Sequence, residues 1–253
     1  MTLPITKKLN QELTELNRYK DKLFSVIAHD LRNPVAGLVG LMDMIHDEFE
    51  SLSAENLFEY LTTLRRNSKN TYKLLEDLLQ WARSQYEQLI LEPTLLNIAD
   101  TTDEVINNLA NQAGEKEISL QNKISEDLWI EADENMLKTI LRNLVSNAIK
   151  FSSAGDSVKI KAAKRQEEIR ISIIDEGKGI KKENQNKILT KSVTYTTRGT
   201  NGEKGSGLGL DLCLDFVERH GGELQFESEP GKGSTFTVIL PEKQETEAKV
   251  NTP

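Results

Sequence analysis

Apolar residues recur every three or four positions along the front of the chain, which is the period of an amphipathic helix. The first run has heptad spacing broken by one lysine, and it comprises Leu9, Leu13, Leu16, Lys20, Leu23 and Ile27. A second run of the same spacing extends from Leu57 to Ala82, and Ser51 or Ser53 is suited to cap its start. The pattern predicts a coiled-coil entry over residues 1–22 and a helical hairpin over residues 23–88.

A hairpin of two long helices presents two apolar stripes, and it cannot bury both of them by itself. A second hairpin packed against the first removes that exposure. We therefore expect a homodimer in which two hairpins form a four-helix bundle.

The pattern changes after residues 89–94, which break the heptads and are interpreted as a linker. From residue 95 to 241, helical periods alternate with period-two runs typical of strands. Helices are predicted over Asn97–Ala113, from the Asp133 cap to Ile149, and over Leu208–His220; strands are predicted near Ile118–Ile124, Val158–Lys161, Ile169–Ile174, Glu223–Glu227 and Ser234–Leu240. The polar stretch 181–205 is predicted to be a mobile lid, and residues 242–253 a disordered tail. Together they predict an α/β sandwich with a mixed sheet.

Composition narrows the class of protein. The 253 residues include 40 acidic and 32 basic side chains, and the resulting net charge of -8 disfavours a nucleic-acid partner. Cys213 is the only cysteine, which excludes an intrachain disulfide and indicates a reducing compartment. No apolar run reaches the roughly 18 residues of a membrane span, and no signal peptide is recognisable. We expect a cytoplasmic location, with membrane contact only through a sensor region that would precede this chain.

Candidate chemistry starts at His29, which Asp30 follows directly within the stretch 24–34. A carboxylate beside an imidazole can hydrogen-bond one ring nitrogen and leave the other more nucleophilic. Most such pairs are ordinary surface residues, so the pair alone is weak evidence. His46 has no motif around it and is interpreted as a surface residue. His220 falls at a predicted helix end, where a cation would be favourable as a cap.

Asn143 and Asn147 are four positions apart, so both amides lie on one face of the predicted helix. An amide oxygen is a hard neutral ligand suited to Mg²⁺ that is also bridged by phosphates. Lys150 adds a cation near the end of the same helix. Two surface asparagines on an amphipathic helix are an equally good interpretation of this segment alone.

Two glycine-rich loops follow. Asp175 ends a predicted strand, where its carboxylate could accept a hydrogen bond from an exocyclic amine such as that of adenine, and Gly177 and Gly179 would let the backbone approach a flat ring. The run 202–210 leads into a helix, whose N-terminus and exposed N–H groups favour phosphate. A plain turn and a flexible hinge are the alternatives. Neither a Walker A loop nor a Rossmann fingerprint is present.

Four segments together resemble one family. His29–Pro34 resembles the H box of two-component sensor histidine kinases, and the segments at 143–151, 174–180 and 202–210 resemble the N, G1 and G2 boxes of the same family, in the same order. The resemblance extends over about residues 20–241. It implies a dimerisation and histidine-phosphotransfer hairpin joined to an ATP-binding domain of the Bergerat type.

The resemblance also implies roles. His29 would accept a phosphoryl group, Asp30 would orient the ring and take its proton, and Asn33 would position water during dephosphorylation of a partner. The implied cofactors are ATP and Mg²⁺, with Asn147 as the metal ligand and an adenine-reading carboxylate at Asp175. The full set of implied nucleotide contacts is Asn143, Asn147, Lys150, Phe151, Asp175, Gly177, Gly179, Ile180, Gly205, Ser206, Gly207, Leu208, Gly209 and Leu210.

The implied function is ATP-dependent autophosphorylation of His29, then transfer to an aspartate of a response regulator receiver domain, with regulator phosphatase activity as a further expectation. One departure concerns the lid: the family often has a phenylalanine between G1 and G2, and residues 188–195 contain none. A lid cation is therefore not assigned among Lys191, Arg198 and Lys204.

Two other functions stay open. One is an ATP hydrolase on the same fold, although such relatives carry an acidic water-activating residue where this chain has Asn143, and an amide cannot act as a general base. The other is a catalytically silent dimeric scaffold, which the intact motifs at His29, Asn147 and Asp175 disfavour.

Overall fold

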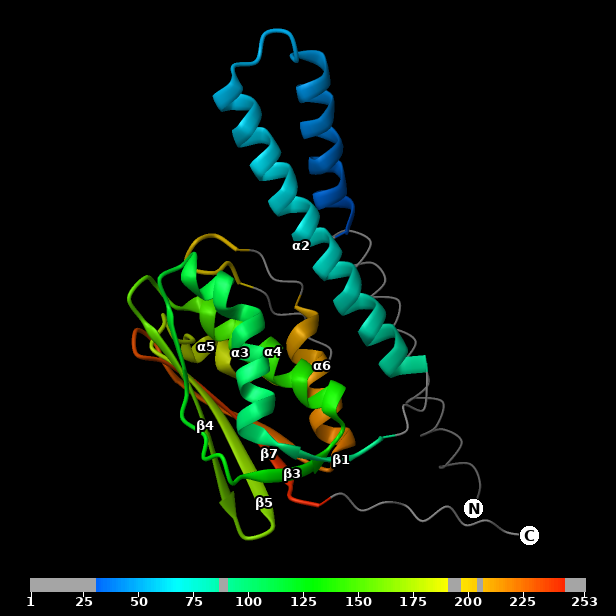
Figure 1. Cartoon of the computed structure of the whole chain (residues 1–253). Helices are drawn as coiled ribbons and strands as arrows, with labels where there is room; N and C mark the ends of the chain where they lie inside the picture. The colour runs from blue at the N-terminus through cyan, green and yellow to red at the C-terminus, as the bar shows by residue number, and fades with distance from the viewer. Residues whose placement is uncertain (1–30, 87–90, 191–196, 204–206, 244–253) are drawn as a thin grey trace, which may run out of the picture. The chain divides into compact units, whose positions relative to one another are not determined.

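The computed structural model describes residues 31–86, 91–190, 197–203 and 207–243 (Figure 1). The chain divides into two compact units between Tyr86 and Glu87. The predicted coiled-coil entry, together with His29 and Asp30, lies outside the described residues. No helix in the described part of the chain is long and apolar enough to cross a membrane.

The first unit contains a helical hairpin, formed by a helix over residues 31–47 and α2 (Ala54–Tyr86) (Figure 1). Ser53 begins α2: its hydroxyl accepts a hydrogen bond from the Asn56 N–H at 3.2 Å. The Ser51 hydroxyl instead donates to the Glu48 carbonyl, at 2.9 Å. Of the two predicted caps, Ser53 is therefore the one used.

The described hairpin leaves many large apolar side chains in contact with solvent, as the two-stripe argument requires. The exposed ones are Val35, Val39, Met42, Met44, Phe49, Phe58, Leu61, Tyr72, Leu75 and Leu79. Many large apolar side chains exposed on one hairpin are typical of an interaction face.

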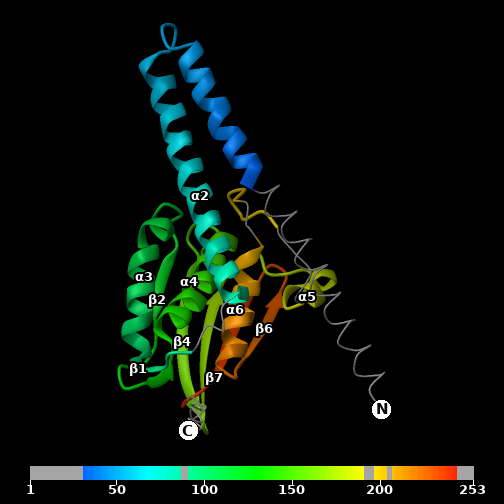
Figure 2. The same cartoon turned by 90° about the vertical axis from the view of Figure 1, so that its right-hand side faces the viewer.

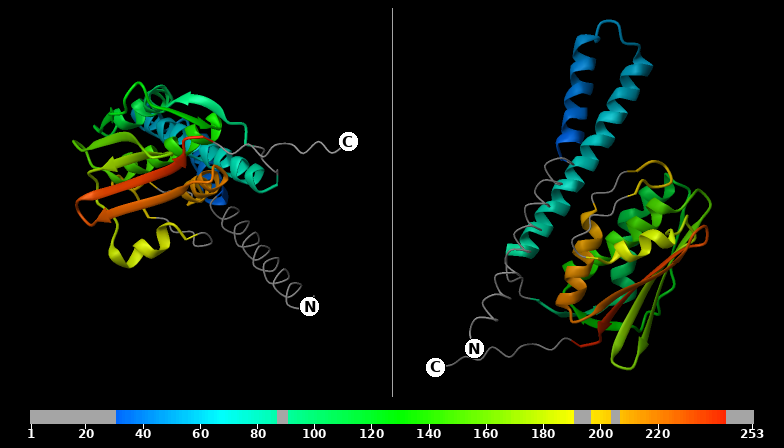
Figure 3. Two further views of the ribbon diagram at one scale, coloured as in Figure 1. Left: turned by 90° about the horizontal axis from the view of Figure 1, so that it is seen from below. Right: turned by 180° about the vertical axis from the view of Figure 1, so that it is seen from behind.

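The second unit is a three-helix layer on one face of a five-stranded sheet (Figures 1 and 3). The sheet order is β2-β4-β5-β7-β6; its strands are β2 (Ser119–Asn122), β4 (Ser157–Arg165), β5 (Glu168–Asp175), β6 (Glu223–Glu229) and β7 (Gly233–Pro241). The covering helices are α3 (Ile98–Gly114), α4 (Glu134–Phe151) and α6 (Leu208–Arg219). Because β2 runs parallel to β4 and the other pairs are antiparallel, the predicted mixed sheet is confirmed.

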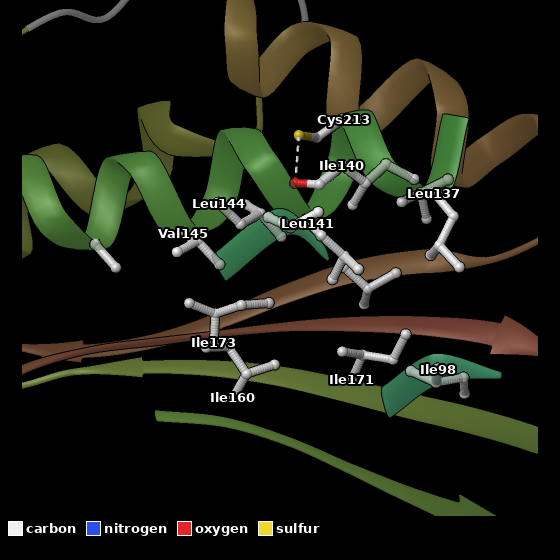
Figure 4. Packing of buried hydrophobic residues seen from close by; sticks show 14 of the residues in the cluster. Ile98, Leu137, Ile140, Leu141, Leu144, Val145, Ile160, Ile171, Ile173 and Cys213 are labelled. Atoms are coloured by element: carbon white, nitrogen blue, oxygen red, sulfur yellow. Dashed lines mark hydrogen bonds between the residues drawn. The ribbon is translucent and has the colours of Figure 1, made fainter. Parts of the chain in front are cut away.

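Helix α4 lies at the centre of this unit because of its sequence pattern. The Asp133 carboxylate caps it by accepting a hydrogen bond from the Met136 N–H at 3.0 Å. Glu134 lies in the first turn and Lys150 in the last, where their charges are favourable to the helix dipole. Its apolar face packs on the alternating isoleucines of the sheet (Figure 4). The buried residues that meet there include Leu137, Ile140, Leu141, Leu144, Val145, Ile160, Ile171 and Ile173.

The core predicts a stability effect. Ile171 is fully buried in β5, so Ile171→Ala should lower the free energy of unfolding by about 2–5 kcal/mol through lost contacts and a residual cavity. Leu95→Ala is the control, because Leu95 is largely exposed and should change stability by less than about 0.5 kcal/mol. Chemical denaturation measures both. Equal losses would show that the described core is not the one that stabilises the chain.

Two strands were not predicted. β1 (Thr94–Asn97) pairs antiparallel with β3 (Trp129–Ala132), and β1 begins at the last residue of the predicted linker. In both strands two apolar residues are adjacent (Leu95 and Leu96, Trp129 and Ile130), so neither shows a clear period of two. Their pairing, and the packing of buried Ile130 against the core, define them instead.

The predicted lid and tail also need correction. The stretch 181–205 contains a short helix, α5 (Lys182–Ile188), beside the end of β6 (Figure 2). Gln185 ties it there by donating to the carbonyls of Ile180 and Ser228. Glu242, assigned to the disordered tail, is held by two backbone hydrogen bonds: its N–H donates to the Glu167 carbonyl at 2.8 Å, and its carbonyl accepts from the Glu131 N–H at 2.9 Å. Residues 244–253 lie outside the described residues.

Candidate functional site

Asp175 continues the buried stripe of β5. Ile169, Ile171 and Ile173 alternate along this strand on the face toward the helices, so the period of two places the Asp175 side chain on the same face. Only 5% of the residue is exposed. Its Oδ1 accepts hydrogen bonds from the N–H groups of Gly177 at 3.0 Å and Ser234 at 3.2 Å. The other carboxylate oxygen has no hydrogen bond to the described residues.

Burial dominates the electrostatics of Asp175. Removal from water raises the pKa of this carboxyl to about 6, and the negative charge of Asp156 acts in the same direction. The two backbone N–H donors act against the shift but do not cancel it. A carboxyl that ionises near neutral pH, with one oxygen held and one available, suits recognition of a hydrogen-bond donor.

The glycines after Asp175 allow close backbone approach. A Cβ at Gly177 would overlap the carbonyl oxygen of Phe151, and a Cβ at Gly179, whose φ is +63°, would overlap that of Glu229. The next N–H group, that of Lys178, donates to the same Phe151 carbonyl at 3.1 Å. The loop of the G1 segment therefore lies directly against the end of α4.

Asn143 and Asn147 differ in burial. Asn143 is buried, and its amide nitrogen has no hydrogen-bond partner among the described residues. Such an unpaired buried donor is uncommon and is explained by a ligand or water. Asn147 is half-buried, and its amide likewise makes no hydrogen bond within the described part of the chain. Both amides are thus available to a ligand.

The N-terminus of α6 lies beside Asn143. Gly207 precedes the helix with a left-handed φ of +75° and, as a glycine, has no side chain that could cap this end. Leu208 is buried in the core and anchors the first turn, whereas a Cβ at Gly209 would come within 3.2 Å of the Asn143 amide oxygen. Glycine therefore permits the positive end of α6 to approach α4. Leu210 is half-buried in this first turn, while Gly205 and Ser206 lie outside the described residues.

Two lysines flank one aromatic ring at the end of α4. The ammonium of Lys150 lies 4.7 Å from the centre of the Phe151 ring, and that of Lys178 lies 4.9 Å from it. Lys178 also donates to the Arg198 carbonyl at 2.6 Å. Sequence reasoning missed Lys178, although its place between Gly177 and Gly179 was a signal.

A segment of the lid is fixed to the same end of α4. The Thr200 N–H donates to the Lys150 carbonyl at 3.1 Å, and the Thr200 hydroxyl donates to the Ser152 carbonyl at 2.5 Å. Lys116, which follows α3, donates to the Lys150 carbonyl and to Glu203. Neither Lys116 nor Thr200 had any sequence signal. Of the proposed lid cations, Arg198 is exposed, and Lys191 and Lys204 lie outside the described residues.

The two histidines that the structure describes have different environments. His220 is 1% exposed; its Nδ1 bonds the Phe216 carbonyl at 2.6 Å, and its Nε2 accepts from the Asp133 N–H at 3.1 Å. Burial lowers the pKa of this imidazole, which is a neutral cap and not the cation expected. His46 is exposed and bonds its neighbour Asp47. His29 lies outside the described residues, and Asn33, four positions on, is exposed on its helix.

Two family models match the chain. Residues 19–87 match the His Kinase A (phospho-acceptor) domain, and residues 132–244 match the histidine kinase-, DNA gyrase B- and HSP90-like ATPase. Among curated relatives, the adaptive-response sensory kinase SasA of Gloeothece citriformis is 30% identical over 241 residues, covering 93% of this chain and 61% of that protein. The sensor protein GacS of Pseudomonas syringae pv. syringae is 27% identical over 252 residues, covering 96% and 28%. The chain thus spans less than two thirds of these relatives.

Solved structures agree. Histidine kinase ThkA, solved in complex with the response regulator protein TrrA, superposes with a TM-score of 0.70 at 23% identity, covering 93% of this chain and 64% of that one, which shows the shared fold. Full-length ShkA, solved in complex with AMPPNP, gives a TM-score of 0.63 at 27% identity and covers 89% and 46%. The predicted helical hairpin followed by an α/β ATPase domain is confirmed. The chain belongs to the two-component sensor histidine kinases and contains their ATP-binding catalytic core.

Proposed function

We propose that this chain transfers the γ-phosphoryl group of ATP to His29 and then to an aspartate of a response regulator receiver domain. The observation that carries the proposal is that three distant segments meet the C-terminal half of α4: the loop after Asp175, the first turn of α6 and the segment 197–203. The amide nitrogen of Asn143 has no hydrogen-bond partner among the described residues, and the positive end of α6 lies beside it. The acceptor segment belongs to the other unit of the chain, as expected if nucleotide and nucleophile are brought together by docking.

The chemistry is a phosphoryl transfer. The bond between the γ-phosphorus and the oxygen bridging to the β-phosphate breaks, a nitrogen–phosphorus bond forms at the His29 imidazole, and ADP leaves. The imidazole proton passes to Asp30. Catalysis of this kind depends on in-line positioning and on charge stabilisation around the phosphates. Lys150, Lys178 and the N-terminus of α6 are positive groups of the described site that suit this purpose.

Magnesium fits the donor set at Asn147. Its neutral amide oxygen is available, and the described residues contain no group of three or more histidine, cysteine or acidic side chains that could hold a metal alone. Phosphate and water oxygens would complete the coordination, as is usual for Mg²⁺. When bound, the ion would offset negative charge on the phosphates.

Simple ATP hydrolysis is less consistent with the site. Asn143 occupies the position where hydrolytic relatives carry an acidic residue, and an amide does not accept a proton from water. A silent scaffold is also disfavoured, because Asp175 is buried with one carboxylate oxygen that makes no hydrogen bond to the described residues, which suits a ligand.

We infer two partners for this chain, a second copy of itself and a response regulator. Its exposed apolar side chains support a homodimer, in which a second hairpin covers them. ThkA was solved in complex with a response regulator protein, which supports the same class of partner for this chain. Exposed Asn33 could position water when a phosphorylated regulator is bound. We place the reaction in the cytoplasm, where ATP is supplied.

The reaction can be tested by labelling. Incubation with γ-labelled ATP and Mg²⁺ should transfer label to the chain, and the bond should be acid-labile and alkali-stable, as for phosphohistidine. Label in the α-position should not be transferred, and EDTA should abolish the reaction. Label from α-labelled ATP, or an acid-stable product, would refute the proposal.

A further inference from the structure

Lys116 is a buried lysine outside the four recognised motifs. Only 6% of the residue is exposed, and it lies just after α3. Its ammonium donates to the carbonyls of Ile149 at 2.9 Å and Lys150 at 2.8 Å, and to the Glu203 carboxylate at 2.8 Å. All three N–H donors of the ammonium are therefore used.

Burial of an ammonium is costly unless the charge is paired and its donors are satisfied. Two of the acceptors are carbonyls in the last turn of α4, where the helix dipole places negative charge. The third is a carboxylate contributed by a segment 87 positions later in the sequence. The ammonium of Lys116 thus joins three parts of the chain: the residues after α3, the last turn of α4 and the segment 197–203.

Glu203 makes hydrogen bonds of its own besides the one from Lys116. Its second carboxylate oxygen accepts from the Asn201 N–H at 2.8 Å, and its backbone carbonyl accepts from the Gly199 N–H at 2.8 Å. Burial pushes the pKa of Glu203 upward, but the bonds from Lys116 and Asn201 outweigh it, so the pKa lies below its ordinary value. The carboxylate is therefore ionised and paired with Lys116 at neutral pH.

The joined parts form one wall of the proposed nucleotide site. The last turn of α4 carries Lys150 and Phe151, and the segment 197–203 lies against it through Thr200. Glu203 is only four positions before Gly207, which begins α6. A displacement of Glu203 would therefore move groups on both sides of the site.

We propose that Lys116 is a positioning residue of the nucleotide site, which fixes the segment 197–203 onto the last turn of α4 through Glu203. This inference rests on the proposed ATP-dependent function. Lys116 touches neither nucleotide nor reacting atoms; it acts through Lys150, Phe151 and the entry to α6. Sites whose supporting residues are removed loosen, and lose affinity without losing their fold.

The test is a double-mutant cycle on the full chain, with the affinity for AMPPNP measured by titration calorimetry in the presence of Mg²⁺. Lys116→Met should weaken binding by about tenfold and Glu203→Ala by about fivefold, which are ordinary sizes for coupling through a supporting residue. The double variant should bind no more weakly than Lys116→Met, because both substitutions break the same connection. Thermal denaturation is measured in parallel.

Lys138→Met is the matched control. Lys138 lies near the other end of α4 and also contacts two carboxylates, those of Glu104 and Glu134, but it is more exposed. The Lys138→Met variant should bind AMPPNP with unchanged affinity. A fall in melting temperature with unchanged affinity in Lys116→Met and Glu203→Ala would overturn the positioning role.

If Lys116→Met does not fold, Glu203→Ala alone decides, because Glu203 is partly exposed and its loss leaves the contacts between Lys116 and α4 in place. Additive effects in the cycle would also contradict the inference. Failure of the unsubstituted chain to bind AMPPNP would instead refute the proposed function, so the two failures are distinguishable.

Discussion

Replacing His29 with glutamine should abolish transfer of label from γ-labelled ATP to the chain, a loss of at least about a thousandfold. Glutamine has similar size but no nucleophilic nitrogen, so no nitrogen–phosphorus bond can form. The affinity for AMPPNP should change by less than about twofold, because every proposed nucleotide contact lies beyond residue 142. Filter-bound label and calorimetry measure the two quantities on the same sample.

His46→Gln is the control for this experiment. His46 is followed by Asp47 just as His29 is followed by Asp30, and its Nδ1 lies 3.1 Å from the Asp47 carboxylate. Since His220 is buried with both ring nitrogens engaged, only His29 and His46 are candidate acceptors. Labelling that survives in His29→Gln and disappears in His46→Gln would transfer the acceptor role to His46.

Asp175→Asn should weaken ATP binding by roughly a hundredfold, since a hydrogen bond to an ionised group contributes about 1.5–3 kcal/mol. Asparagine keeps an oxygen for the N–H groups of Gly177 and Ser234. Its second polar group, however, is an NH₂ group. The hydrogen-bond donor of the base would then meet another donor, where Asp175 offers an acceptor. Titration calorimetry with AMPPNP measures the loss.

The same substitution should stabilise the domain at pH 7.5. The pKa of Asp175 is raised from 3.8 to about 6 by burial, so its contribution to stability is fully present below about pH 3.8 and is lost as the pH rises through 6. At pH 7.5 the buried carboxylate therefore lowers the free energy of unfolding, by up to about 3 kcal/mol. Asp175→Asn should recover part of this lost free energy of unfolding. Denaturation of the variant and of the unsubstituted chain at pH 7.5 and at pH 5 would show the gain.

Nucleotide affinity should fall as the pH decreases through about 6 in the unsubstituted chain, because protonation of Asp175 removes the ionised acceptor. The phosphates of the nucleotide titrate in a similar range, so the difference between the unsubstituted chain and Asp175→Asn isolates this carboxyl. Asp156→Asn is the control: it removes a nearby negative charge and should retain affinity. Equal affinity in Asp175→Asn would exclude Asp175 as a base-reading group.

Local patterns predicted the parts of the fold that are long and periodic. The Asp133 cap and the apolar face of α4 were recognisable because each depends on residues within one or two turns. The position of Asp175 at the end of β5 was also predicted, whereas its burial was not. In contrast, β1 and β3 show no clear period of two, and they are defined by their pairing with each other.

Charge states were predicted less well than positions. His220 is at a helix end, as expected, but it is neutral because burial and the Asp133 N–H determine its protonation. Likewise α5 arose within a polar stretch because Gln185 bonds the end of β6, a contact between segments more than 40 positions apart. No window of sequence contains such information.

By itself the sequence determined which residues we propose for the chemistry: a histidine beside an aspartate, two asparagines on one helical face, and glycines where backbone must come close. These are local properties, fixed by helical and strand periods and by the absence of a Cβ. Only the tertiary structure decided that the end of α4 is where the nucleotide segments meet, that Asp175 ionises near pH 6, and that Lys116 joins α4 to Glu203. The physical reason is that burial and long-range hydrogen bonds depend on the packing of segments far apart in the chain.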